Sequence, residues 1–361
     1  MRQANEIDFW RGFALASIFI NHIPDNVFDR FTHRNLGLSD SAELFVFLAG
    51  WSLRRLVDGN ARPTDTPQLM LRLSGRALTL HSAQILITVL ALAMLAAAAL
   101  YFDTPPLLEW HNAASFFNAA APTVIGIVLL THQLGYFDIL PLYVVLMHGA
   151  PLVAVARRLR PQALLPVSVG IYLAALVFNW NMPTWPVEGR WYFNPLSWQL
   201  IFVLGFELAD EQSVIGAWVH RNGSLLRWLA ALGVTLGALA VFIHIWPDPT
   251  RVPWPPLLFV FNKTYLSPAR LLHFLSLAML CAGLFGVLHG WIRPVTRYLS
   301  MLGRNSLNVF CVLSLLSLAG QLVQFRFGSG LIIDTLVVSS GLVLLGFTAW
   351  LSELQDRLRP R

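Results

Sequence analysis

The chain has 361 residues, of which 56% are hydrophobic and 12% charged, and its mean hydropathy is +0.60. This composition excludes an ordinary soluble domain and indicates an integral membrane protein that contacts the lipid bilayer. The net charge of +6 comes from arginines that flank the apolar stretches. We therefore do not expect nucleic acid as a partner.

Ten stretches are apolar and long enough to be assigned to a hydrocarbon core about 30 Å thick. They lie near residues 7–27, 41–57, 77–102, 137–156, 163–180, 196–209, 224–246, 271–291, 301–325 and 331–352. No long polar linker or internal repeat separates them. We predict an all-α, polytopic membrane protein with about ten transmembrane helices and a single domain over residues 1–361. The first stretch is charged and lacks a small-residue cleavage site after it, so we expect it to be retained.

The basic residues are distributed unequally between the two predicted sides. If the helices alternate in direction, most of the 25 lysines and arginines lie on the side of the two chain ends. The positive-inside rule then places both the N-terminus and the C-terminus in the cytoplasm. The few basic residues on the opposite side are Arg30, Arg34, Arg190, Arg251, Lys263, Arg270 and Arg326.

The first predicted helix carries ionisable groups along one face. Steps of three and four residues align Asp8, Arg11, Leu15, Ile18 and His22. Arg11 and His22 are about 16 Å apart along a helix axis. Because charges inside a membrane helix are costly, they usually face a cavity or a partner. The pattern predicts a polar passage, although Asp8 and Arg11 could simply form an ion pair and His22 could cap its helix.

The second predicted helix runs back in the opposite direction. Glu43, Phe47, Gly50 and Arg54 share one of its faces, which places Glu43 at about the depth of His22. A carboxylate there could fix the imidazole tautomer and stabilise its protonated form. Structural pairing of Glu43 with Arg30 or Arg34 is the alternative. Arg54 and Arg55 would lie near the level of Arg11 and form a basic cytoplasmic mouth.

Three connections on the predicted outer side, residues 103–136, 181–195 and 247–270, combine prolines with aromatic and polar residues. Tryptophan and tyrosine favour the membrane interface, and a surface that stacks on sugar rings would have a similar composition. The sequence leaves both interpretations open. His111 and His132 in the first connection could line the entrance to a site or lie on a solvated surface.

The remaining reactive residue types do not indicate a metal or a disulfide. Cys281 and Cys311 both lie within apolar segments, where packing is the expected role. The histidines show no ligand spacing such as H-E-x-x-H, so we predict no metal site.

Two blocks of sequence carry a resemblance to a known family. The opening "EIDFWRGFALASIFINHIPDNVFDRFTHRNLGLSDSAELFVFLAGWSL" resembles that of the OpgC family, within the wider group of membrane acyltransferases typified by acyltransferase-3 proteins. Arg11 and His22 match its R-x10-H spacing, and residues 43–51 match its second helix. Near the other end, "YLSMLGRNSLNVF" (residues 298–310) resembles a stretch that many members carry on a late helix.

The resemblance implies an acyl-CoA-dependent O-acyltransferase of the bacterial inner membrane. The acyl group would pass from cytoplasmic acyl-CoA, a co-substrate rather than a bound cofactor, to a glycan hydroxyl at the periplasmic face. OpgC proteins are similar to enzymes that succinylate osmoregulated periplasmic glucans. The residues identify neither the acyl group nor the acceptor, and a homodimer is compatible with the sequence.

Under this interpretation His22 is the general base, assisted by Glu43, and a covalent acyl-histidine is the less favoured variant. The residues expected to bind acyl-CoA are Asp8, Arg11, Arg54, Arg304, Asn305 and Ser306. The residues expected to bind the acceptor or an oxyanion are Trp191, Asn194, Gln199, Asn262, Lys263, Arg270 and His273. Helix capping or an interfacial role is the alternative for these two sets.

Two other functions fit a membrane protein with buried charges. A transporter or flippase also places Asp, Arg and His along its substrate pathway, and an inverted repeat would favour it. A non-catalytic membrane scaffold would tolerate neutralisation of the charged stripe.

Overall fold

The computed structural model describes residues 4–58 and 66–358. Within these ranges the chain is almost entirely helical. The strands in these ranges form one short antiparallel pair, β1 (Pro183–Thr184) and β2 (Gly189–Arg190). The all-α prediction is confirmed.

The first two helices pack against partners from late and central parts of the chain. Asn5 caps α1 (Glu6–Asn21) by accepting a hydrogen bond from the Asp8 backbone N–H. A Cβ atom at Gly12 would overlap the carbonyl of Leu299 in α13 (Arg293–Arg304), so this glycine allows α1 and α13 to pack closely. In α2 (Ser41–Asp58), Gly50 allows the same approach to α8 (Pro195–Leu208).

The other helical elements complete the fold. Five short elements lie in connections: η1 (Val27–Phe31), η2 (His33–Leu36), η3 (Pro105–Asn112), α4 (Ala114–Asn118) and η4 (Pro256–Leu258). The remaining α-helices are α3 (Thr66–Tyr101), α5 (Ala120–Val128), α6 (Ile139–Leu159), α7 (Pro161–Val177), α9 (Val214–Arg221), α10 (Gly223–Phe242), α11 (Pro268–Cys281), α12 (Leu284–Trp291), α14 (Ser306–Phe327) and α15 (Leu331–Leu358).

The predicted count of ten spans is not confirmed. Among the described residues, five helices are long and apolar enough to cross a membrane, namely α3, α6, α10, α14 and α15. A sixth span results if α11 and α12, bent by 55°, are counted together. Length explains part of the difference, since α1 has 16 residues and reaches only about 24 Å, while α8 has 14. The predicted segment 301–325 is divided between α13 and α14.

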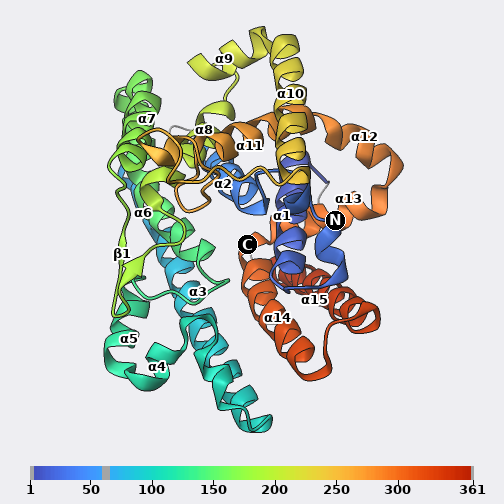
Figure 1. The fold of residues 1–361 in the computed structure, drawn as a ribbon. Coiled ribbons are helices and arrows are strands. Elements are labelled where there is room, and N and C mark those ends of the chain that lie inside the picture. Colours follow the sequence, from blue (N-terminus) through green and yellow to red (C-terminus); the bar gives the residue numbers. More distant parts are fainter. Residues whose placement is uncertain (1–3, 59–65, 359–361) are drawn as a thin grey trace.

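Figure 1 shows how the helices are distributed. α9 and α10 lie together at one end of the molecule, while α4 and α5 lie at the opposite end near β1. Late helices pack directly on early ones, because α1 contacts α13 and α14, and α14 also contacts α3 and α15. The buried core lies where α1, α2, α6, α8 and α14 converge. Residues far apart in the sequence therefore meet around the end of α1.

Candidate active site

His22 lies at the C-terminal end of α1 and faces a cavity of about 410 Å³, called here the histidine cavity. Segments from several distant parts of the chain line it. They contribute Asp40 before α2, Asp138 before α6, Tyr192 before α8 and Lys263 before α11. The His22 Nδ1 atom is buried without a hydrogen-bond partner. No group among residues 4–58 and 66–358 therefore occupies this imidazole nitrogen.

Contacts from two neighbouring segments hold His22 in place. Gln321 Nε2 of α14 donates a hydrogen bond to the His22 carbonyl oxygen at 2.6 Å. The Gln321 Oε1 atom accepts from His111 Nε2 at 2.7 Å. The Tyr136 ring lies between the two histidines, with ring centroids 5.1 Å from His22 and 5.3 Å from His111. Gln321, His111 and Tyr136 thus fix both the backbone and the ring of His22.

Glu43 does not contact His22 as the sequence interpretation expected. It is fully buried and accepts hydrogen bonds from Arg270 at 2.6 and 2.9 Å and from the Asp40 backbone N–H at 2.9 Å. No hydrogen bond joins it to His22, Arg30 or Arg34 within residues 4–58 and 66–358. A partner 227 residues away therefore neutralises this carboxylate.

A second ion pair connects this cluster to the histidine cavity. Asp40 accepts from Lys263 Nζ at 2.5 Å and lies 3.4 Å from Arg270 Nη2. Burial alone would raise the pKa of Asp40, but Lys263 and Arg270 hold it well below its usual range. Burial also favours neutral Lys263, yet Asp40 and Glu43 together raise its pKa. Lys263 is therefore a fixed positive charge at the edge of the histidine cavity.

Asp138 is a cavity carboxylate that the sequence interpretation missed. It lies immediately before α6 and lines the histidine cavity. No ion pair or side-chain hydrogen bond occupies its carboxylate in the described part of the chain. Burial raises its pKa to about 6, and Lys263 opposes this shift. The sequence signal was an acidic residue directly before an apolar helix.

A second polar cavity, of about 620 Å³, lies at the basic ends of α3 and α13 and is called here the arginine cavity. Arg304, Asn305 and Ser306 line it, as does Tyr143 of α6. The Arg304 guanidinium donates to Glu353 at 2.7 and 2.9 Å, and the Asn305 amide donates to the Met301 carbonyl. The three predicted donor-site residues on the late helices therefore do lie around one cavity.

Arg72 and Arg76 of α3 also line the arginine cavity. Both side chains are exposed, and no ion pair neutralises either of them among the described residues. The sequence interpretation assigned them only to the cytoplasmic side. Their spacing of four residues, which aligns them on one helix face, was the signal that could have identified them.

Arg11 and Arg54 line neither cavity. Arg11 donates to Ser52 Oγ and to the Gly303 carbonyl at 3.2 Å, and lies 3.5 Å from Asp8. It therefore links α1, α2 and α13, and the Asp8 contact is the local ion pair that the sequence left open. Arg54 is bound by the carboxylates of Asp58 and Asp210. Within residues 4–58 and 66–358, Arg11 and His22 therefore do not share either of these two cavities.

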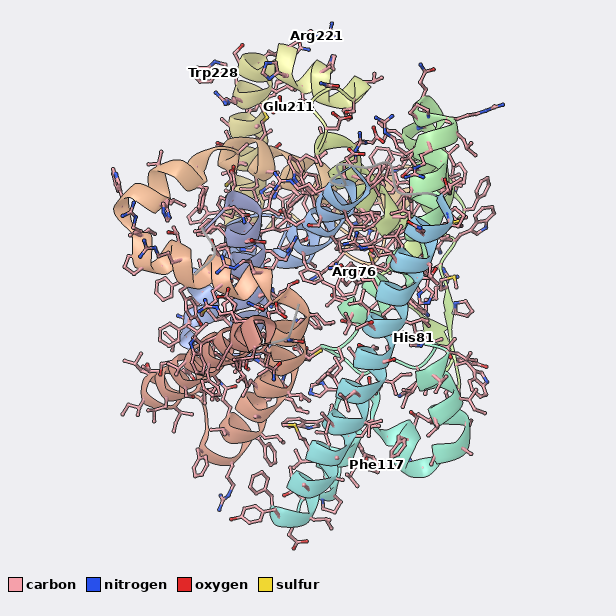
Figure 2. All side chains as sticks on the ribbon, turned by 180° about the vertical axis from the view of Figure 1, so that it is seen from behind. Arg76, His81, Phe117, Glu211, Arg221 and Trp228 are labelled. Carbon is pink, nitrogen blue, oxygen red and sulfur yellow. The ribbon has the colours of Figure 1, made fainter. Side chains whose placement is uncertain are left out.

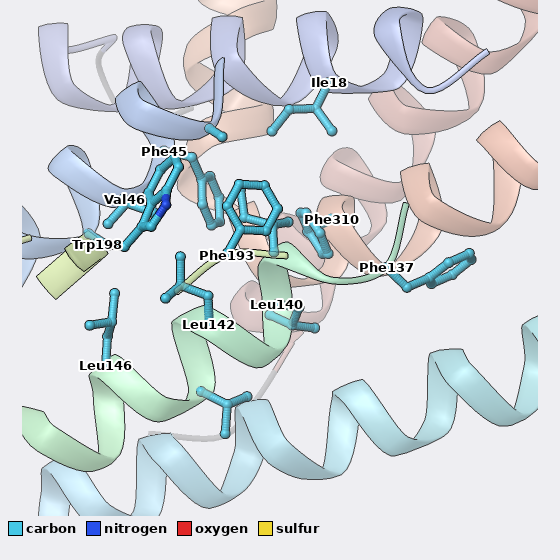
Figure 3. Close-up of a cluster of buried hydrophobic side chains, with 14 of the residues drawn as sticks. Ile18, Phe45, Val46, Phe137, Leu140, Leu142, Leu146, Phe193, Trp198 and Phe310 are labelled. Carbon is cyan, nitrogen blue, oxygen red and sulfur yellow. The ribbon is translucent and has the colours of Figure 1, made fainter. Parts of the chain in front are cut away.

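An apolar layer separates the two cavities. It consists of Ile18, Phe45 and Phe310, which lie in one buried cluster (Figure 3). The Phe45 and Phe310 rings have centroids 5.7 Å apart. Ala42 faces the histidine cavity and Phe45, three residues later, faces the arginine cavity. A three-residue step is about 4.5 Å, so along α2 the linings of the two cavities come within about one helical turn of each other.

Of the predicted acceptor-site residues, Lys263 lines the histidine cavity and Arg270 supports it through Asp40. The others occupy structural positions. Asn194 caps α8 and donates to the Trp180 carbonyl. Gln199 pairs with Ser168 of α7.

The last three predicted acceptor-site residues also lie outside the lining of the histidine cavity. Trp191 is buried, and Asn262 accepts from the Tyr265 backbone N–H within a turn. The His273 Nδ1 atom is 2.8 Å from Ser39 Oγ.

Comparison with known proteins gives one match. The family model described as OpgC protein matches residues 2–357. No curated protein and no solved structure matches the chain.

Proposed function

Because the chain belongs to the OpgC family, membership of which suggests a transferase, we propose that it is an acyl-CoA-dependent O-acyltransferase of the bacterial inner membrane. It moves an acyl group, such as succinyl, from the cytoplasmic side to a glycan hydroxyl on the periplasmic side. The observation that carries the proposal is the pair of polar cavities on either side of an apolar layer. One cavity offers arginines for phosphates, and the other offers a base and a fixed positive charge.

The arginine cavity provides the donor site of this proposal. CoA carries several phosphate charges, which guanidinium groups bind through charge-assisted hydrogen bonds. Arg72 and Arg76 are exposed there, and Arg304 also lines this cavity. The flexible pantetheine arm then extends toward Phe45 and Phe310. Rotation of these rings lets the thioester cross the layer and reach His22.

The histidine cavity provides the groups for direct transfer. His22 removes the proton from an acceptor hydroxyl as its oxygen attacks the thioester carbonyl carbon. The Lys263 ammonium stabilises the negative charge that develops on the carbonyl oxygen. The C–S bond then breaks, and the proton held by His22 passes to the leaving sulfur. The products are the O-acyl ester and free CoA. Glu43 and Arg270 support this site by holding Asp40 and Lys263.

The proposal is tested with purified protein, labelled acyl-CoA and a panel of glycans. We expect labelled glycan and free CoA to form in equal amounts. Movement of a glycan across sealed vesicles with no consumption of acyl-CoA would instead indicate a transporter or flippase.

Removal of one arginine should weaken donor binding specifically. For Arg76→Ala we expect the KM for acyl-CoA to rise about tenfold, which corresponds to one charge-assisted contact, with kcat nearly unchanged. Figure 2 shows Arg221 at one end of the molecule, well away from Arg76, so Arg221→Ala is the matched control. An unchanged KM together with a reduced kcat in Arg76→Ala contradicts the donor site.

Asp138 should impose its own pH dependence. Its raised pKa means that the carboxylate is charged above about pH 6 and neutral below it. A charged Asp138 accepts a hydrogen bond from the acceptor more strongly than a neutral one, so kcat/KM for the acceptor should fall as the pH decreases through about 6. Asp138→Asn should lack this step. Identical pH profiles for the two proteins would contradict this role.

A further inference from the structure

Residues of α1, α2, α11, α12 and α13 line a further cavity, of about 600 Å³, which the proposed reaction does not use. It is called here the lateral groove. Most of its lining is apolar. The lining includes the rings of Phe9, Trp10, Phe13, Phe47, Trp51 and Phe274. Asp40 lines both the lateral groove and the histidine cavity, so the two spaces adjoin at this carboxylate.

The lateral groove reaches an apolar surface of the protein. Ile292 and Val295 line it, and they are 42% and 48% exposed. Leu284 and Val287 of α12, which lie close by in the sequence, are exposed as well. In a membrane protein, a contiguous apolar surface of this kind contacts lipid. The molecules that can enter the groove from this side are therefore those of the bilayer.

The charges around the lateral groove favour a hydrocarbon chain over an anion. Among the residues that the structure describes, its lining contains neither lysine nor arginine, so a carboxylate or phosphate would find no ion-pair partner. The two acidic residues of the lining already have partners. Glu6 accepts a hydrogen bond from the Gly283 backbone N–H at 2.9 Å, and Asp40 is paired with Lys263. The groove therefore suits the uncharged part of a lipid.

Trp51 supplies the lateral groove with a hydrogen-bond donor that has no partner. Its indole Nε1–H is buried and meets no acceptor in residues 4–58 and 66–358. A buried donor that remains unpaired is costly, so a ligand that brings an acceptor is favoured. The ester carbonyl at the head of a phospholipid acyl chain is such an acceptor, whereas a plain hydrocarbon has none.

We propose that the lateral groove binds an acyl chain of a bilayer phospholipid. The chain enters beside Ile292 and Val295 and packs on the aromatic rings. Its ester carbonyl accepts a hydrogen bond from Trp51 Nε1, and the charged headgroup stays outside the groove. Because Asp40 lines the groove, the chain also keeps water away from the ion pair of Asp40 and Lys263. The lipid is a bound component rather than a substrate, so this inference goes beyond the proposed function.

The test adds a phospholipid with a photoreactive diazirine in one acyl chain to delipidated protein in detergent. We expect crosslinks within residues 6–13 and 44–51, which line the groove, and competition by unlabelled phospholipid. Ala278 leaves space on the α11 side, so Ala278→Trp should fill the groove and lose most of these crosslinks. Ala93→Trp, on an exposed position of α3 outside the groove, is the matched control. Absence of crosslinks in both ranges of the wild-type protein overturns the proposal, as does equal crosslinking of these ranges in Ala278→Trp.

Trp51→Phe tests the contact with the ester while it retains an aromatic ring. We expect the Kd of the phospholipid to rise about threefold to tenfold, the effect of one neutral hydrogen bond. The Kd of hexadecane, which has no carbonyl, should stay the same. An unchanged phospholipid Kd, or an equal rise for both ligands, overturns the contact. Tighter binding of hexadecanoate than of phospholipid overturns the phospholipid as occupant. These measurements need no acyl-CoA, so their outcome does not depend on whether the protein transfers acyl groups.

Discussion

Replacing His22 with alanine should reduce kcat for acyl transfer about 10²- to 10⁴-fold, the range typical of a lost general base. The KM for acyl-CoA should remain near that of the wild type, because the arginine cavity lies on the other side of the apolar layer. The measurement is the formation of labelled glycan by purified protein.

His22→Ala should also remain folded. The contact with Gln321 is made by the His22 carbonyl oxygen, which alanine retains, and the ring packs beside Tyr136. A thermal melt close to that of the wild type checks this. His220→Ala, which removes a histidine at the exposed end of α9, is the matched control. A His22→Ala protein with wild-type kcat would exclude His22 as the base.

Replacing Arg270 with methionine should destabilise the protein by about 3–5 kcal/mol, because it leaves a buried carboxylate without its partner. Glu43 is fully buried and receives two hydrogen bonds from Arg270. Asp40 would retain Lys263 but lose its second cation. We expect a clear decrease in the thermal unfolding midpoint of the detergent-solubilised protein.

A double variant separates the charge effect from lost packing. Glu43→Gln together with Arg270→Met removes both charges, so it should recover much of the stability lost in Arg270→Met alone. Equal destabilisation of the single and double variants would show that the pair acts through packing alone. The loss of stability in Arg270→Met would then not come from the unpaired carboxylate of Glu43.

The predicted helix faces were a good guide to the site at the end of α1, but they could not supply partners that are distant in sequence. His22 lies beside a polar cavity, as its place on the polar face of the first predicted helix suggested. Glu43 was expected to pair with a nearby group, yet its partner Arg270 belongs to α11. Such a contact depends on how the helices pack, and helical periodicity within one segment contains no information about it.

The donor side shows the same limit. Arg304, Asn305 and Ser306 were expected at an anion site and do line a cavity, but Arg76 joins them from α3. Arg11 was expected at the same anion site because of its spacing from His22. Instead its guanidinium donates to the Gly303 carbonyl and so joins α1 to α13. The spacing of two residues in one helix fixes the distance between them. It does not determine which other helix packs against each residue.

The number of membrane crossings was the least predictable feature. Apolar composition alone cannot distinguish a span from a helix that is buried by its neighbours. α8 is strongly apolar but short, and nearly all of its residues are buried within the protein. α11 and α12 formed one predicted segment, and the chain bends between them at Gly283, whose φ of +81° favours glycine.

The apolar layer is central to the account, because the two polar cavities communicate only through it in the proposed reaction. The most direct test uses sealed vesicles that contain the protein, with labelled acyl-CoA enclosed and a glycan that cannot cross the bilayer outside. We predict labelled glycan outside and free CoA inside, with neither formed by the His22→Ala protein. Transfer that requires acyl-CoA and glycan on the same side of the membrane would contradict the account.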